Sequence, residues 1–168
     1  TVKSMLRPVL SAASMAGAVI GPAGVEKVGA ALHRAGMPLW TPALPSAYYR
    51  HKLDTGSSDR KVVYFPSCIN QTMGASREDG GDKPRPLIDT MVALCRKAGY
   101  EVIFPDGMDN LCCGMIWESK GMPEVAERKV RELERALAEA SSGGRWPVLC
   151  DQSPCLHRMR EHISSMHL

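Results

Sequence analysis

The sequence predicts an α/β protein, a small three-layer domain with a parallel sheet of about three strands, preceded by an N-terminal helical extension. Two observations lead to this fold class. After residue 60, short apolar runs alternate with longer amphipathic stretches, as is typical of a parallel sheet joined by right-handed helical crossovers. Before residue 61, two apolar stretches lead into a Pro-rich segment. We therefore expect residues 1–60 to form the extension and linker, and residues 61–168 to form the α/β domain.

The extension is predicted from residues 8–16 and 24–35, in which Val, Ala and Leu recur at helical spacing. Pro8 suits the first position of a helix, where its missing N–H costs nothing, and Gly36 suits a helix stop. Prolines at positions 38, 42 and 45 exclude regular structure from the linker that follows.

The apolar character of this extension raises the question of a membrane. Its longest apolar stretch, residues 9–25, is interrupted by Gly17, Gly21 and Pro22, so we expect a poor membrane span. We expect the two helices to pack instead on a partner domain outside this sequence. Because the chain begins with Thr1, we interpret it as a fragment of a longer protein.

The elements of the α/β domain follow from periodicity. Residues 62–65, Val-Val-Tyr-Phe, form a continuous apolar run, as expected of a strand buried on both faces. Ser153 is a candidate N-cap, with Pro154 at the first helical position. Glu127 with Arg131 and Glu132 with Arg135 are candidate ion pairs on a helix surface. The remaining predictions are strands at 100–104 and 146–149, helices at 86–97, 123–140 and 153–166, and a polar loop at 71–84.

Five of the six cysteines fall where the predicted strands end, and this is the strongest functional signal in the chain. In parallel sheets, ligands bind outside the carboxyl ends of the strands. Thiolates at that edge are preferred ligands for iron–sulfur clusters and zinc. The five candidate metal ligands are Cys68, Cys112, Cys113, Cys150 and Cys155. The sixth, Cys95, lies on the apolar side of a predicted helix, and we interpret it as a core residue.

Three other uses of these cysteines fit the sequence less well than a metal centre. A disulfide between the adjacent Cys112 and Cys113 would be strained. A structural zinc site would need four ligands, which leaves a fifth thiol over. Reduced core cysteines would explain any one position, but not five at one edge. Because no signal peptide is recognisable, we expect a cytoplasmic protein, in which cysteine clusters favour metal or redox chemistry over structural disulfides.

Composition and motifs argue against several other functions. The formal net charge of +3 is small and the basic residues are scattered, so we expect no nucleic-acid partner. No Gly-x-Gly-x-x-Gly follows the first strand, so we expect no flavin or nicotinamide site in this chain. Cys155 lies near a helix N-terminus, which we expect to lower its pKa. We expect His157 at a helix surface, and Trp117 either to shield a metal centre or simply to pack.

The cysteine pattern resembles that of a known family. Cys68, then Cys112-Cys113-Gly114, then Cys150-Asp-Gln-Ser-Pro-Cys155 resembles the cysteine-rich CCG domain. That domain recurs in heterodisulfide reductase B subunits, in iron–sulfur subunits of glycolate and glycerol-3-phosphate oxidation systems, and in lactate-utilisation proteins. Residues 112–121, residues 151–155 and the upstream Pro38-Leu-Trp-Thr-Pro stretch are similar to the C-terminal part of the large FAD-linked, iron–sulfur D-lactate dehydrogenases.

The resemblance implies an iron–sulfur cluster, of 4Fe-4S type, although some copies of the domain hold zinc. Cys68, Cys112, Cys113 and Cys155 match the family pattern. Four residues separate Cys150 from Cys155, where the family often has two, so Cys150 is either a ligand reached by a different turn or a strand-end core residue.

The resemblance further implies an oxidoreductase fragment that transfers electrons. A D-lactate or other 2-hydroxy acid would be oxidised at FAD in another domain of the parent chain. Electrons would pass through the cluster to a quinone or carrier protein. The fragment alone would be inactive, and its location would be cytoplasmic or peripheral at the inner face of the membrane. Two alternatives remain open: a zinc-binding or metal-free interaction domain, and a thiol redox module of the heterodisulfide-reductase kind.

Overall fold

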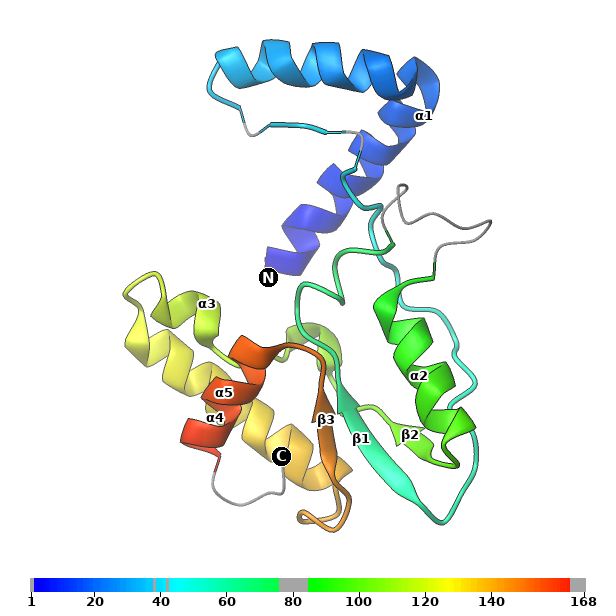
Figure 1. The fold of residues 1–168 in the computed structure, drawn as a ribbon. Coiled ribbons are helices and arrows are strands. Elements are labelled where there is room, and N and C mark those ends of the chain that lie inside the picture. The colour runs from blue at the N-terminus through cyan, green and yellow to red at the C-terminus, as the bar shows by residue number, and fades with distance from the viewer. Residues whose placement is uncertain (1, 38, 42, 76–84, 164–168) are drawn as a thin grey trace. The chain divides into compact units, whose positions relative to one another are not determined.

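The computed structural model describes residues 2–37, 39–41, 43–75 and 85–163 (Figure 1). Within these ranges the protein is α/β, with a three-stranded parallel sheet and a long N-terminal helix, which confirms the predicted fold class. The chain divides into two compact units. The first combines Thr1–His51 with Ile69–Leu87, and the second combines Lys52–Cys68 with Ile88–Leu168. The division was expected at residue 60, whereas Ile69–Leu87 clusters with the N-terminal residues.

The first unit is built around helix α1, Val2–Arg34. Gly21 breaks it with a left-handed φ of 69° and an extended ψ of 174°, and Pro22 follows at once. The two predicted helices therefore lie on opposite sides of this kink. The expected start at Pro8 was wrong, because α1 begins at Val2 and Pro8 lies inside it. Pro8 lies beyond the first turn of α1, so it removes one backbone hydrogen bond from the helix.

Polar contacts tie α1 to later segments of the same unit. The Lys3 ammonium donates a hydrogen bond of 2.7 Å to the Gln71 side chain, and Arg7 donates one of 2.8 Å to the Gln71 carbonyl. The linker itself forms no helix or strand among its described residues, as its prolines predict. It is nonetheless fixed by an antiparallel bridge between Ala47 and Met73.

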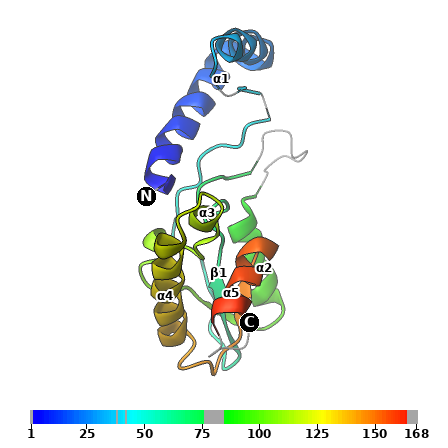
Figure 2. The same cartoon turned by 90° about the vertical axis from the view of Figure 1, so that its left-hand side faces the viewer.

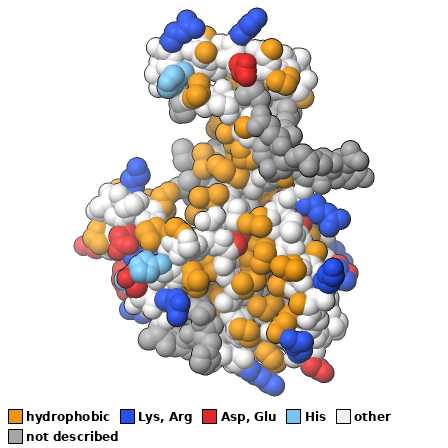
Figure 3. Space-filling view, viewed as in Figure 1, with side chains coloured by type: hydrophobic (Ala, Val, Ile, Leu, Met, Phe, Trp, Pro, Cys, Tyr) orange, Lys and Arg blue, Asp and Glu red, His pale blue; other side chains and the backbone are white. Residues whose placement is uncertain are grey.

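Much of α1 is apolar and exposed. From Leu6 to Arg34 it is long and apolar enough to cross a membrane, judged by length and composition alone. An 18-residue window of this segment has a mean hydropathy of 1.4, and 17% of the window is buried. Val9, Met15 and Val19 are all more than half exposed. Hydrophobic side chains also reach the surface of the second unit (Figure 3). One of them is Leu94 of helix α2, Leu87–Lys97, which is more than half exposed.

The sheet of the second unit has the strand order β2-β1-β3 and is parallel throughout. Its strands are β1, Lys61–Phe65; β2, Glu101–Ile103; and β3, Val148–Cys150. The central strand β1 is buried from Val62 to Phe65, as its apolar run predicts. Its last residue, Phe65, is in register with Cys150, so β1 and β3 end side by side.

Helices cover both faces of this sheet, and Figure 2 shows β1 between α4 and α2. Val63 and Phe65 point into a core made with α4, Pro123–Ala140, and α5, Ser153–His162. Helix α2, Leu87–Lys97, buries Ile88 and Val92. The alternation of side chains along a strand explains how one short strand serves two layers.

Most predicted elements are found, with differences near their ends. Helix α4 has the predicted bounds, and its Glu127–Arg131 ion pair of 2.9 Å is confirmed. Glu132 pairs with Lys129 at 2.6 Å rather than with Arg135. The double-cysteine loop contains two short helices that were not predicted, η1 (Met108–Asn110) and α3 (Met115–Glu118).

The last helix also differs in detail. Ser153 is the first helical residue rather than the N-cap, because Gln152 holds the N-cap position without a side-chain hydrogen bond. The described helix ends at His162, whereas residue 166, where the helix was expected to end, lies outside the described residues. Parts of the predicted 71–84 loop, from residue 76 on, lie outside them as well.

Candidate metal centre

The cysteines lie where the parallel strands end. Cys150 is the last residue of β3, and Cys155 is the third residue of α5. Cys112 and Cys113 lie between η1 and α3, in the connection that follows β2. Cys68 lies three residues beyond Phe65, whose backbone partner is Cys150. The structure thus places all five candidate ligands at or after carboxyl ends of strands, which is where the sequence predicted them.

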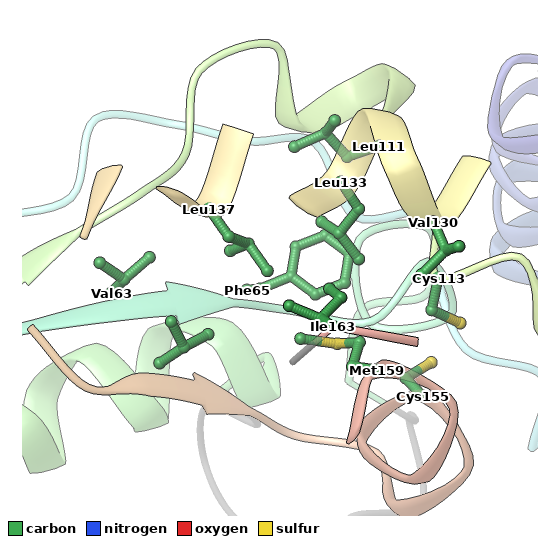
Figure 4. Close-up of a cluster of buried hydrophobic side chains, with 11 residues drawn as sticks. Val63, Phe65, Leu111, Cys113, Val130, Leu133, Leu137, Cys155, Met159 and Ile163 are labelled. Carbon is green, nitrogen blue, oxygen red and sulfur yellow. The ribbon is translucent and has the colours of Figure 1, made fainter. Parts of the chain in front are cut away.

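Four of these thiols contact one another in a chain. The Cys113 thiol hydrogen-bonds with those of Cys112 and Cys155, and the Cys155 thiol also hydrogen-bonds with that of Cys150. Figure 4 shows the sulfur atoms of Cys113 and Cys155 facing each other at the end of the hydrophobic core. Cys113 and Cys155 are 4% and 9% exposed, whereas Cys112 and Cys150 are half-buried. The site therefore has two inner and two outer thiols.

These contacts set the directions of the thiol pKa values. The hydrogen bond with Cys112 raises the pKa of Cys113 to about 11. Hydrogen bonds with Cys113 and Cys150 raise the pKa of Cys155. The hydrogen bond between Cys150 and Cys155 lowers the pKa of Cys150. The expectation that the pKa of Cys155 is lowered was therefore wrong, because its hydrogen bonds with Cys113 and Cys150 raise that pKa.

The remaining cysteines occupy different positions. Cys68 is half-buried, just after the Ser67 amide that donates a hydrogen bond of 2.8 Å to Asp151. Cys95 is half-buried on α2 rather than fully in the core, and burial raises its pKa. Of the other residues singled out, His157 is at the surface as expected, 3.3 Å from Glu161, and Trp117 is half-buried on α3.

Asp151 joins the two strand ends that carry Cys68 and Cys150. Its carboxylate accepts hydrogen bonds from the Tyr64 hydroxyl at 2.7 Å and from the Ser67 amide at 2.8 Å. Tyr64 is fully buried, and this burial together with the Asp151 contact raises its pKa. The sequence displayed Asp151 beside a cysteine, but gave no sign that it would bond to β1.

Arg158 of α5 supports the turn that carries Cys112 and Cys113. Its side chain is 2% exposed, and its Nε donates a hydrogen bond of 2.9 Å to the Cys113 carbonyl. The guanidinium also pairs with Glu118 of α3. Arg158 was not among the residues predicted to support the site. The only available signal was its spacing, because Cys155, Arg158 and Met159 share one face of a helix, and that face is buried.

Gly114 allows this turn to sit close to its neighbours. Its φ is +90°, and a Cβ there would lie 2.5 Å from the Ala126 carbonyl oxygen and 3.0 Å from the Arg158 Nε. A side chain at this position would be strained by the backbone and would clash with α4. Gly114 therefore keeps Cys112 and Cys113 against both α4 and α5.

The donor set can be compared with the needs of an iron–sulfur cluster or zinc. Four thiols at one edge supply the number and softness of ligands that either group takes. Within the described ranges, however, no three His, Cys, Asp or Glu side chains are arranged around a common metal position. The thiols hydrogen-bond with one another instead. The contacting Cys112, Cys113, Cys150 and Cys155 would hold a cluster, with Cys68 following the neighbouring strand β1, and a bound cluster would supply one-electron transfer.

Comparison with known proteins gives no further assignment. No family model, no curated protein and no solved structure matches this chain.

Proposed function

We propose that this chain is the iron–sulfur electron-transfer domain of a larger FAD-linked dehydrogenase that oxidises D-lactate or another 2-hydroxy acid. The single observation that carries the proposal is the gathering of Cys112, Cys113, Cys150 and Cys155 into one group of contacting thiols, with Cys68 at the same sheet edge. Such a group at the carboxyl edge of a parallel sheet is suited to a soft metal centre.

The burial of the inner thiols supports electron transfer over an exposed catalytic thiol. Cys113 and Cys155 are packed within a hydrophobic cluster that includes Phe65, Val130 and Met159. An iron–sulfur cluster held by these thiols would be shielded from water on the side of Cys113 and Cys155. The half-buried Cys112 and Cys150 would lie on its outer side, toward the surface. Electrons could then enter or leave through the outer side, from the flavin domain and to a quinone or carrier protein. The location proposed is cytoplasmic or peripheral at the inner membrane face.

A thiol redox module is the second candidate, and the pairwise contacts favour it specifically. Cys155 hydrogen-bonds with both Cys113 and Cys150, so two thiols are already in contact with a third. Such neighbours could exchange with a disulfide substrate, although the raised pKa values of Cys113 and Cys155 oppose thiolate formation.

The experiment that separates these functions is anaerobic reconstitution with ferrous iron and sulfide. The chain should acquire iron and acid-labile sulfide together with visible absorption and an electron spin resonance signal after reduction. Tight binding of zinc with no uptake of iron or sulfide would favour the interaction domain. Absence of both metals, with turnover of a small disulfide, would favour the redox module.

A further inference from the structure

We propose that Arg158 is a positioning residue for the metal centre, holding the Cys112–Cys113–Gly114 turn through the Cys113 carbonyl and placing a buried positive charge at that backbone. This inference rests on the proposed function for its redox part, whereas its positioning part concerns the thiol group alone. It starts from an arginine that is 2% exposed, in a helix whose other arginine, Arg160, is exposed.

The burial of Arg158 requires an explanation. Arginine is almost never fully buried unless it is paired, because removing a guanidinium from water is costly. Here the Nε donates to the Cys113 carbonyl at 2.9 Å, and the guanidinium pairs with Glu118, whose side chain is 48% exposed. The Nε of the guanidinium thus binds the backbone of a candidate ligand, and its Nη1 pairs with a half-exposed carboxylate.

The geometry also shows why an arginine is needed at this position. A guanidinium is a rigid planar fork that donates in two directions at once, which a lysine ammonium on a flexible stem does not reproduce. The two acceptors lie on opposite sides of Gly114, at Cys113 and at Glu118 in α3. Arg158 therefore links α5, which carries Cys155, to the turn that carries Cys112 and Cys113.

The charge of Arg158 has a second consequence. Thiolates of a metal centre are negative, and a centre that accepts an electron becomes more negative. A cation at the backbone of Cys113 stabilises both, whereas Glu118 partly offsets that cation. Removing the arginine should therefore lower the reduction potential of a bound cluster, and removing the Glu118 charge should raise it.

The positioning claim can be tested with cobalt(II) alone, without any cluster. Arg158→Met keeps much of the volume but removes both the donor and the charge, and Arg160→Met is the matched control on the exposed side of α5. We expect Arg158→Met to bind cobalt(II) about 10- to 100-fold more weakly, with an altered thiolate charge-transfer spectrum, as for other groups that orient metal ligands. Arg160→Met should match the parent chain. Parent-like affinity and spectrum in a folded Arg158→Met variant would overturn the claim.

Arg158→Lys provides a second test in case Arg158→Met does not fold. It keeps the buried charge but not the fork, so its cobalt(II) affinity should lie between those of the parent and of Arg158→Met. If circular dichroism shows Arg158→Met unfolded, parent-like binding by Arg158→Lys would still refute the need for the fork.

The redox part is tested separately on the reconstituted chain. The reduction potential of Arg158→Lys should differ from that of Glu118→Gln. Arg158→Met should lower the reduction potential, and Glu118→Gln should raise it. Shifts of the same sign would show that the residues act only through structure. Failure of the parent chain to take up iron and sulfide would sink the proposed function, while the cobalt(II) comparison would still decide the role of Arg158.

Discussion

The Tyr64 hydroxyl donates a hydrogen bond of 2.7 Å to the Asp151 carboxylate, and this contact joins β1 to the residue that directly follows Cys150. The other carboxylate oxygen accepts the Ser67 amide, one residue before Cys68. Asp151 thus sets the spacing between two candidate ligands that are distant in sequence. Its partners Tyr64 and Ser67 are fully buried, so neither can turn to water instead.

Replacing Asp151 with Asn should destabilise the second unit by about 2 kcal/mol, since hydrogen bonds to a charged group are worth roughly 1.5–3 kcal/mol each and an amide replaces only one acceptor. Urea unfolding followed by circular dichroism measures this difference. Asp106→Asn, at an exposed position, is the matched control and should change stability by less than about 0.5 kcal/mol. Equal effects of the two substitutions would contradict a structural role for Asp151.

Replacing Tyr64 with Phe should cost about 1–2 kcal/mol near pH 8, because the Asp151 carboxylate loses a buried donor. The pKa of Tyr64 is raised above its usual value near 10, so the folded chain resists ionisation while the unfolded chain does not. The stability that Tyr64 confers is therefore complete below pH 10 and declines as the pH rises above it. The stability difference between parent and variant should shrink by about 1.4 kcal/mol per pH unit above pH 10.

Urea unfolding at pH 8, 10 and 11 would show this narrowing, and the other tyrosines cancel in the difference. Tyr100→Phe is a suitable control, since Tyr100 lies outside this hydrogen-bonded pair and contacts Arg60 instead. A parent–variant gap that stays constant up to pH 11 would mean that Tyr64 ionises as freely in the folded chain as in the unfolded one.

Replacing Gly114 with Ala should be far more costly than the same change at Gly121. Both glycines have a left-handed φ, of +90° and +73°, so both substitutions incur backbone strain of about 1 kcal/mol. Only at Gly114 would the new Cβ meet another atom closely, the Ala126 oxygen at 2.5 Å, whereas Gly121 has open space. We expect a difference of at least 2 kcal/mol in the free energy of unfolding, measured by urea titration. Similar losses for both variants would show that the turn relaxes away from α4.

The strands and long helices could be predicted from sequence because burial in this fold follows simple periodicity. β1 is continuously apolar and is buried on both faces, and α4 combines an apolar stripe with Pro123 at its start. The cysteine edge could be predicted as well, because strand ends at one edge of a parallel sheet follow from topology.

The support of the site could not be predicted, because it depends on contacts between distant segments. The bond from Arg158 to Cys113 joins residues 45 apart in sequence, and that from Tyr64 to Asp151 joins residues 87 apart. An arginine also has the sequence signature of a surface residue, so its burial becomes visible only when α3 and α5 are packed. Short helices such as α3 are set by local turns at Gly114 rather than by periodicity.

The central claim is that the thiol group of Cys113 and its neighbours binds an iron–sulfur cluster. The most direct measurement is iron and acid-labile sulfide per chain after anaerobic reconstitution, compared among the parent, Cys113→Ser and Cys95→Ala. We predict matching iron and sulfide in the parent and in Cys95→Ala, whose thiol belongs to α2, and almost none in Cys113→Ser. Iron and sulfide near zero in the parent, or undiminished in Cys113→Ser, would contradict the account.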